Sequence, residues 1–228
     1  MNKFGAIVLS RYNSSRLPGK ALMTIHGKEV LQIIIERLSI VIPLERIVIA
    51  TSSEASDDPI AEFAKVRGYN CFRGSLDNVA LRFYEAAKHY NFEYAARING
   101  DNVFVDTLVL KSMIKQISHS YDFITNVHKR TYPKGMSIEI VKLSSYRNAL
   151  SEISTDKKYF EHVTSYWYEH LPENVFFQYN TELPEAAGLQ FALDTPEDFE
   201  NISSIFDAFT ESHIKYNLER ILPLYTQK

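Results

Sequence analysis

The 228-residue sequence predicts an α/β fold in which a mostly parallel sheet is flanked by helices. Short apolar runs rich in β-forming residues alternate with helical patterns through the first half of the chain. This alternation is typical of right-handed βαβ units, whose parallel strands are covered on both faces. Hydrophobic residues make up 45% and charged residues 23%, the balance of a globular protein. We therefore expect a single domain over residues 1–228, without linkers or internal repeats.

The elements follow in order from the first apolar run. The expected strands are Phe4–Leu9, Arg46–Ala50, Asn70–Arg73, Tyr94–Ile98, Asp122–Thr125, Ser137–Lys142, Val175–Tyr179 and Leu189–Leu193. The expected helices lie near Glu29–Val41, Asp58–Arg67, Asn78–Tyr90, Thr107–Ser118 and Phe160–Leu171, followed by two closing helices. Asp58 and Pro59 are typical of an N-cap and a first-turn proline. The alternation loosens after Asn126, so approximately residues 127–172 are expected to form a small inserted hairpin or dimerisation arm.

A basic loop, Ser10–Lys20, follows the first buried strand and precedes a helical pattern. It presents the cations Arg11, Arg16 and Lys20 together with hydroxyl groups and a Pro-Gly turn. Such a loop suits an anionic ligand, because glycine lets the backbone approach and guanidinium and ammonium groups complement phosphate oxygens. The plainer alternative is a solvated basic turn. The position directly after a buried strand favours phosphate binding.

Several functional classes are disfavoured. The loop is not a Walker A motif, because Ser14 replaces its first glycine and Ala21 follows the lysine. A net charge of −3 argues against nucleic-acid binding. The single cysteine, Cys71, excludes an internal disulfide framework and fits a reducing cytosol. No apolar run suits a signal peptide or a membrane span, so we expect a cytoplasmic protein without membrane insertion.

Two acidic residues, Asp101 and Asp194, each follow a predicted strand. Ligands of open α/β sheets bind at the carboxyl ends of parallel strands, so both carboxylates are expected near the basic loop. Two carboxylates facing phosphates suit Mg²⁺, which takes its remaining oxygens from phosphate and water. Gly100 and Asp101 also suit a plain turn, and Thr195 is a good helix N-cap. The N-cap role of Thr195 does not account for Asp194.

The basic loop resembles the Arg-x-x-Ser-x-Arg-Leu-Pro-Gly-Lys signature of the CMP-sugar synthetase superfamily, matching at Arg11, Ser14 and the run Arg16–Lys20. That group includes CMP-Kdo and CMP-acylneuraminate synthetases and SpsF-type cytidylyltransferases. The segment Leu193–Asp198 is similar to the family's Asp-Thr-Pro-Glu-Asp segment. The resemblance implies a Rossmann-like nucleotide-diphospho-sugar transferase fold. It also implies that the loop holds the triphosphate of CTP and that Asp101 and Asp194 bind Mg²⁺.

Further candidate ligands lie on other loops. The Gly-Ser-x-Asp stretch at Ser75 and Asp77 resembles a family segment beside the nucleoside, although both residues also suit helix capping. Arg82 either points toward the phosphates or is solvated, and Thr51 lies in a polar loop at the same edge. The candidate nucleotide-binding residues are Ser10, Arg11, Ser14, Arg16, Gly19, Lys20, Thr51, Ser75, Asp77 and Arg82. The candidate catalytic residues are Arg11, Lys20, Asp101 and Asp194.

Lys134, Glu139, Glu161 and His162 match SpsF-type relatives, and the resemblance assigns them to an acceptor pocket. Glu161 and His162 also suit an ordinary helix surface. The resemblance implies Mg²⁺-dependent transfer of CMP from CTP to a sugar acid or related surface-glycan precursor, with release of pyrophosphate, by a homodimer.

Two alternatives stay open. A glycosyltransferase would need an Asp-x-Asp motif, whose second acid is absent at Val103. The altered flanks at Leu9-Ser10, Asn99 and Val103 keep a non-catalytic nucleotide-binding subunit open as the second alternative. An assay of pyrophosphate release separates both from a cytidylyltransferase.

Overall fold

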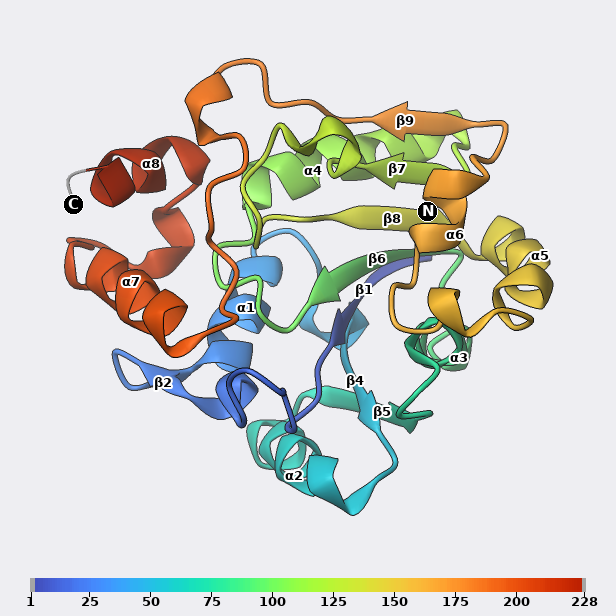
Figure 1. The fold of residues 1–228 in the computed structure, drawn as a ribbon, viewed down its shortest axis with the longest axis horizontal. Coiled ribbons are helices and arrows are strands. Elements are labelled where there is room, and N and C mark those ends of the chain that lie inside the picture. The colour runs from blue at the N-terminus through green and yellow to red at the C-terminus, as the bar shows by residue number, and fades with distance from the viewer. Residues whose placement is uncertain (1–2, 227–228) are drawn as a thin grey trace.

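A seven-stranded sheet forms the centre of the computed structural model, which describes residues 3–226 (Figure 1). The strand order is β5-β4-β1-β6-β8-β7-β9. The strands are β1 (Phe4–Leu9), β4 (Ile47–Ser52), β5 (Asn70–Gly74), β6 (Tyr94–Asn99), β7 (Phe123–Thr125), β8 (Glu139–Lys142) and β9 (Val175–Phe177). Strands β5, β4, β1 and β6 are parallel, whereas β8 runs antiparallel to β6 and β7. The α/β class with a mostly parallel sheet is confirmed.

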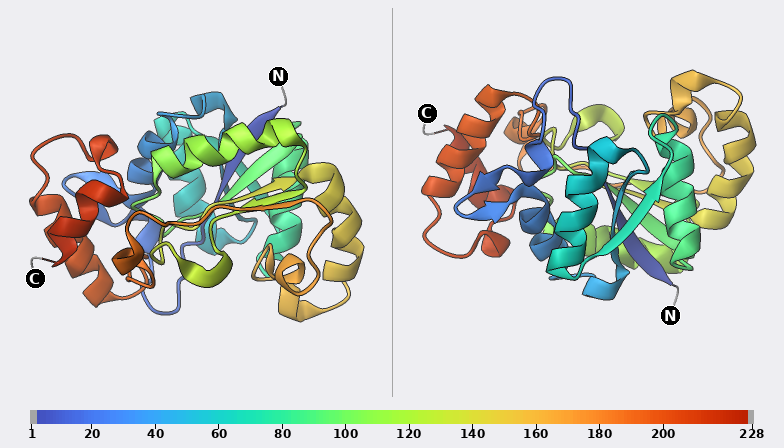
Figure 2. Two further views of the ribbon diagram at one scale, coloured as in Figure 1. Left: turned by 90° about the horizontal axis from the view of Figure 1, so that it is seen from above. Right: turned by 90° about the horizontal axis from the view of Figure 1, so that it is seen from below.

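Helices cover both faces of this sheet (Figure 2). The helices sharing one core are α1 (Val30–Leu38), α2 (Asp58–Arg67), α4 (Thr107–Lys115), α7 (Pro196–Asp207) and α8 (Leu218–Thr226). Those sharing the other are α3 (Val79–His89), α5 (Leu143–Ile153) and α6 (Ser165–Glu169). Strand β1 alternates between the two cores, with Ala6 and Val8 in the first and Ile7 and Leu9 in the second. Both faces of β1 are therefore buried, as its uninterrupted apolar run predicts.

The predicted strand Leu189–Leu193 is wrong. The strand pairing of this segment consists of a single isolated bridge between Lys134 and Gln190. The Lys134 N–H donates to the Leu189 carbonyl (2.8 Å), and the Phe191 N–H donates to the Lys134 carbonyl (2.9 Å). The chain thus lies beside residue 134 without joining the sheet.

The predicted helix Phe160–Leu171 is shortened to α6 (Ser165–Glu169). The Phe160 carbonyl accepts from the Ala80 N–H of α3 (3.0 Å), and the Val163 carbonyl accepts from the Tyr146 hydroxyl of α5 (2.7 Å). These carbonyls bond to neighbouring helices instead of to their own turn. Helix α5, which carries Tyr146, has no counterpart among the predicted elements.

The small hairpin and the predicted insertion occupy different places. The two-stranded hairpin consists of β2 (Thr24–Ile25) and β3 (Lys28–Glu29), directly before α1. The segment 127–172 instead contributes β8 to the main sheet, between β6 and β7, and adds α5 and α6 to one of its faces. Its proposed part in dimerisation stays a prediction. Within residues 3–226, no helix is long and apolar enough to cross a membrane.

Candidate active site

Two adjoining cavities open where β1 and β6 end. The first has a volume of about 400 Å³ and the second about 530 Å³. The residues that line both cavities are Arg97, Asn99, Asp101, His162 and Asp194. The candidate nucleotide ligands that line the first cavity are Ser10, Arg11, Ser14, Arg16, Lys20 and Arg82. This is the sheet edge at which ligands of open α/β folds bind.

Tyr12 holds the two ends of the turn in the basic loop together through its backbone carbonyl. Its carbonyl accepts hydrogen bonds from the N–H groups of Ser14 (3.0 Å) and Gly19 (2.8 Å). Gly19 has a φ of 73°, a left-handed conformation that glycine adopts without strain. The loop therefore folds back at Gly19 and brings Lys20 toward the end of β6.

Asp57, at the N-cap of α2, ties this loop to the sheet. Asp57 accepts from the N–H of Tyr12 (2.7 Å) and from the N–H of Ser52 at the end of β4 (2.9 Å). Burial raises the pKa of Asp57, but the hydrogen bonds it accepts outweigh this effect and lower the pKa overall. Helix α2 begins at Asp58, so its N-cap is Asp57, one residue before the predicted N-cap. Sequence reasoning missed the contacts that Asp57 makes with the basic loop and with β4.

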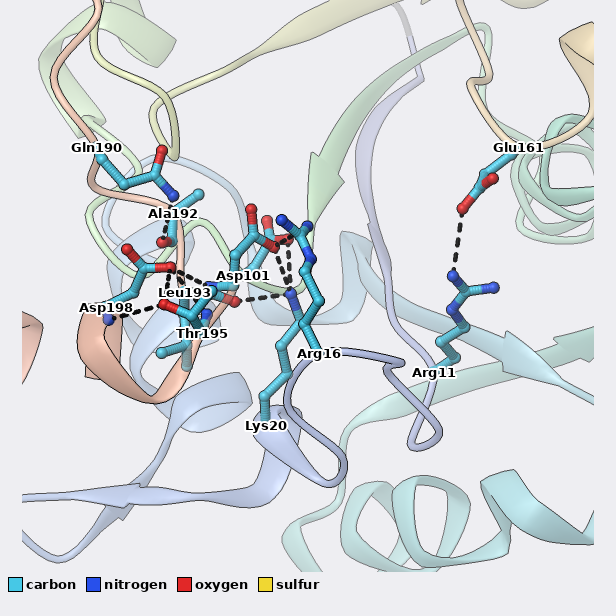
Figure 3. Close-up of polar contacts among 11 residues, drawn as sticks. Arg11, Arg16, Lys20, Asp101, Glu161, Gln190, Ala192, Leu193, Thr195 and Asp198 are labelled. Carbon is cyan, nitrogen blue, oxygen red and sulfur yellow. Dashed lines mark hydrogen bonds and ion pairs between the residues drawn. The ribbon is translucent and has the colours of Figure 1, made fainter. Parts of the chain in front are cut away.

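Lys20 lies between the loop that carries Asp101 and the segment that carries Asp194 (Figure 3). Its Nζ donates to Asp101 Oδ2 (3.0 Å), Asp194 Oδ1 (3.1 Å) and the Leu193 carbonyl (2.7 Å). The side chain of Lys20 is only 14% exposed, and those of the two aspartates are 20% and 21% exposed. The two carboxylates, 93 residues apart in sequence, therefore share one cation.

Three backbone features bring these aspartates together. The Leu193 N–H donates to the Asp101 carbonyl (3.1 Å), so the two chain segments are directly bonded. A Cβ on Gly100 would lie 2.9 Å from the Leu9 carbonyl oxygen, so only glycine allows this approach to β1. Gly135, with φ of 86°, likewise packs against the backbone of Phe191. The carboxylates thus converge although Leu189–Leu193 is not a strand.

The side chain of Asp194 plays no part in the N-cap of α7. Thr195 accepts from the Asp198 N–H, and Asp198 accepts from the Thr195 N–H, which together form a capping box. Asp194 instead pairs with Lys20 and with Arg16, whose Nη2 lies 2.9 Å from Asp194 Oδ1. The capping role and the ion pairs belong to different residues.

Arg11 and Arg82 occupy the other side of the first cavity. Arg11 pairs with Glu161 across the loop (3.2 Å), well apart from Lys20 (Figure 3). Arg82 is 2% exposed and donates to the Ser75 carbonyl (2.6 Å), so a solvated Arg82 is wrong. Burial lowers the pKa of Arg82 to about 10, which leaves it a cation at neutral pH.

The remaining nucleotide candidates lie outside both cavities. Thr51 is fully buried within β4, not in a loop, and Gly19 packs against the Tyr12 ring. Ser75 accepts from the Asn78 N–H (3.0 Å), while Asn78 itself caps α3 and Asp77 is exposed. Of these residues, Ser75 supports the start of α3 and Gly19 the turn of the basic loop.

The acceptor candidates Lys134, Glu139 and His162 line the second cavity, and Glu161 lines the first. Glu139 is engaged within the protein through an ion pair with Arg97 and two hydroxyl donors. Arg97 and Asn99 line both cavities and were missed as ligands by sequence reasoning. Arg97 is the one charged residue of the otherwise mostly apolar strand β6, and this isolated charge could have marked it as a candidate ligand.

Comparisons with known proteins identify the family. The sequence model of the cytidylyltransferase family matches residues 5–221. The chain belongs to the cytidylyltransferase family. It is therefore a CTP-dependent nucleotidyltransferase.

Similar proteins include the spore coat polysaccharide biosynthesis protein SpsF of Bacillus subtilis, 32% identical over 220 residues that cover 90% of this chain and 87% of SpsF. The structure of a cytidylyltransferase from Leptospira borgpetersenii superposes with a TM-score of 0.89 at 28% identity, covering 100% of this chain and 95% of that one. A CMP:2-keto-3-deoxy-manno-octonic acid synthetase complexed with CTP has a TM-score of 0.70 at 16% identity, covering 90% and 99%. The last likeness shows the fold, which is thus shared with a synthetase.

Proposed function

We propose that this cytidylyltransferase transfers CMP from CTP to a sugar acid or related surface-glycan precursor and releases pyrophosphate. The first cavity takes CTP and the second takes the acceptor. The observation that carries this proposal is that the two cavities meet at shared residues, among them Arg97, Asp101 and Asp194. A nucleotide and an acceptor bound there would have their reacting groups side by side.

Transfer requires attack by an acceptor oxygen on the α-phosphorus, in line with the departing pyrophosphate. The bond from the α-phosphorus to pyrophosphate breaks as the new oxygen–phosphorus bond forms, and the acceptor loses a proton. Positioning and charge neutralisation supply most of the acceleration in such reactions. Lys20 and Arg11 would hold the phosphates, and buried Arg82 would add charge from the opposite wall.

The residues present fit a divalent cation. Asp101 and Asp194 already hold the Lys20 ammonium between them, and Asp194 also contacts the Arg16 guanidinium. No cluster of three or more His, Cys, Asp or Glu suited to a metal occurs in the part of the chain that the structure describes. Two carboxylates suffice for Mg²⁺ when phosphate and water complete its coordination. Such an ion would neutralise phosphate charge, while Lys20 turns from the aspartates toward the triphosphate.

The relatives support the biological setting. SpsF is named for spore coat polysaccharide biosynthesis, and the synthetase structure holds CTP. We place this protein by analogy in the cytoplasmic synthesis of an activated surface-glycan precursor. The homodimer stays a prediction, and light scattering tests it by measuring the molar mass of the purified protein in solution.

Pyrophosphate release tests the proposal. CTP, UTP, ATP and GTP are each incubated with Mg²⁺ and a panel of sugar acids and polyol phosphates. We expect release with CTP and one class of acceptor, and much less with the other nucleotides. Tight CTP binding with no release from any acceptor would instead support a non-catalytic subunit. Comparable turnover of all four nucleotides would remove the cytidine specificity.

A further inference from the structure

Arg97 is a largely buried cation at the junction of the two cavities. It lies on β6, four residues before Asp101, and its side chain is 13% exposed. In residues 3–226 its one hydrogen-bond partner is Glu139, at 2.6 Å from Nη1. Nε is buried without a partner there. A guanidinium carries five N–H donors, so most of the donors of Arg97 are unused by the protein.

Glu139 holds this guanidinium in place. One carboxylate oxygen, Oε2, accepts from Arg97, and the other accepts from the hydroxyls of Thr164 (2.7 Å) and Tyr168 (2.6 Å). The side chain of Glu139 is 2% exposed. Burial raises the pKa of Tyr168, and the charge of Glu139 raises it further, so Tyr168 stays a neutral hydroxyl that donates.

The ion pair of Arg97 and Glu139 satisfies the hydrogen-bonding groups of Glu139 but not those of Arg97. A fixed carboxylate faced by three donors is satisfied and has little capacity left for an acceptor hydroxyl or amine. Arg97 has the opposite character, because it lines both cavities and has donors to spare. A buried polar group without partners is costly, which indicates that Arg97 finds an acceptor of hydrogen bonds when ligand is bound.

The charges around Arg97 indicate what that ligand is. Asp101 is paired with Lys20, Asp194 with Lys20 and Arg16, and Glu139 with Arg97 itself. The second cavity is further lined by three exposed cations: Lys129, Arg130 and Lys134. This wall has no unpaired carboxylate to balance them. The cavity therefore favours a ligand with at least one negative charge.

We propose that Arg97 is the centre of an anion subsite, at which the carboxylate or phosphate of the acceptor binds beside the α-phosphate of CTP. Glu139 is the positioning residue that orients Arg97, and it does not itself bind the acceptor. This inference rests on the proposed function, because it assumes that the second cavity takes the acceptor. Its consequence is that acceptor binding and CTP binding depend on different arginines.

Binding measurements on full-length variants test the subsite. The probes are 3-deoxy-manno-octulosonate, a carboxylate, and glycerol 3-phosphate, a phosphate, each titrated calorimetrically into CTP-saturated protein. Arg97→Met should weaken binding of the preferred anion roughly tenfold to a hundredfold, while CTP affinity stays within about twofold. Arg97→Lys keeps the charge and should be intermediate. Arg147→Met, on the exposed side of α5, is the matched control and should change neither affinity.

Glu139→Gln tests the positioning role. It should weaken anion binding about three- to tenfold with CTP affinity retained, and Glu139→Asp should restore part of the loss. A fall in thermal stability with unchanged anion affinity would make Glu139 merely structural.

Other outcomes overturn the subsite directly. Equal weakening of CTP and anion by Arg97→Met would assign Arg97 to the nucleotide. Wild-type protein that binds CTP but neither anion would also contradict the subsite. Failure of the proposed function is distinguishable, because the separate assay would then detect no pyrophosphate release from CTP with any acceptor, whereas the anion titrations do not depend on turnover.

Discussion

Lys20 should stabilise the nucleotide-free protein and compete with a metal ion. In the absence of ligand its ammonium is the shared counter-ion of Asp101 and Asp194, at 3.0 and 3.1 Å. Lys20→Met keeps the aliphatic stem but leaves Asp101 without its ion-pair partner and Asp194 with Arg16 alone. A charge-assisted hydrogen bond contributes about 1.5–3 kcal/mol, and solvent screening at these partly exposed groups reduces the sum. We expect a loss of about 3 kcal/mol in the free energy of unfolding, or roughly 6–12 °C in Tm.

Differential scanning fluorimetry in EDTA and in millimolar MgCl₂ measures both effects. Mg²⁺ should raise the Tm of Lys20→Met more than that of the wild type, because the wild-type ion must first displace the ammonium. Lys111→Met, an exposed lysine on α4, is the control and should shift stability by no more than about 0.5 kcal/mol. Equal Mg²⁺ shifts in the wild type and Lys20→Met would refute the competition. An unchanged Tm in EDTA would refute the structural role of Lys20.

Other predictions follow from neighbouring residues. Asp101→Asn and Asp194→Asn should each abolish most turnover, and the double variant should be scarcely worse in steady-state kinetics, because groups that act as a unit are not additive. Thr195→Ala should instead lower the free energy of unfolding by about 1 kcal/mol through loss of the N-cap, measured as a fall in Tm, and should spare Mg²⁺-dependent activity. Asp57→Asn should lower stability by about 2 kcal/mol at neutral pH. Since the folded pKa of Asp57 is lowered, its contribution is present above the unfolded value of 3.8 and is lost as pH falls through the folded pKa. Denaturation of wild type and Asp57→Asn should therefore converge in acid, and a constant difference would contradict this.

The central part of the fold was predictable because it depends on local patterns. Strand β1 and helix α2 match their predicted ranges, since a bounded apolar run and a proline at the helix start are strong signals. Helix α5 was predictable but missed. Its apolar residues Leu143, Tyr146, Leu150 and Ile153 recur at helical spacing within a mostly polar stretch.

The segments around α6 and Leu189–Leu193 depend on contacts that no local pattern records. The length of α6 is limited by side chains and N–H groups of two other helices. Leu189–Leu193 is fixed by backbone bonds to residues 101 and 134, far away in sequence.

The candidate site shows the same division. The basic loop and both aspartates could be singled out because cations and acids after buried strands are conspicuous. Strand polarity accounts for the position of Asp101, whereas Asp194 lies beside it through the direct bond between Leu193 and Asp101, which the sequence does not show. Arg97 and Asp57 were missed because each is one charged residue whose partners lie on other elements. A single charge in a sequence does not reveal whether it is solvated, paired or facing a cavity.

The most direct test is a crystal structure of the protein with CTP and Mn²⁺, using anomalous scattering to locate the metal. The account predicts the triphosphate on the basic loop, the cytidine in the first cavity, and an anomalous peak between Asp101 and Asp194. Lys20 should then have left both carboxylates for a phosphate oxygen. CTP bound away from residues 10–20, or a metal held without either aspartate while Lys20 still bridges them, would contradict the proposed site.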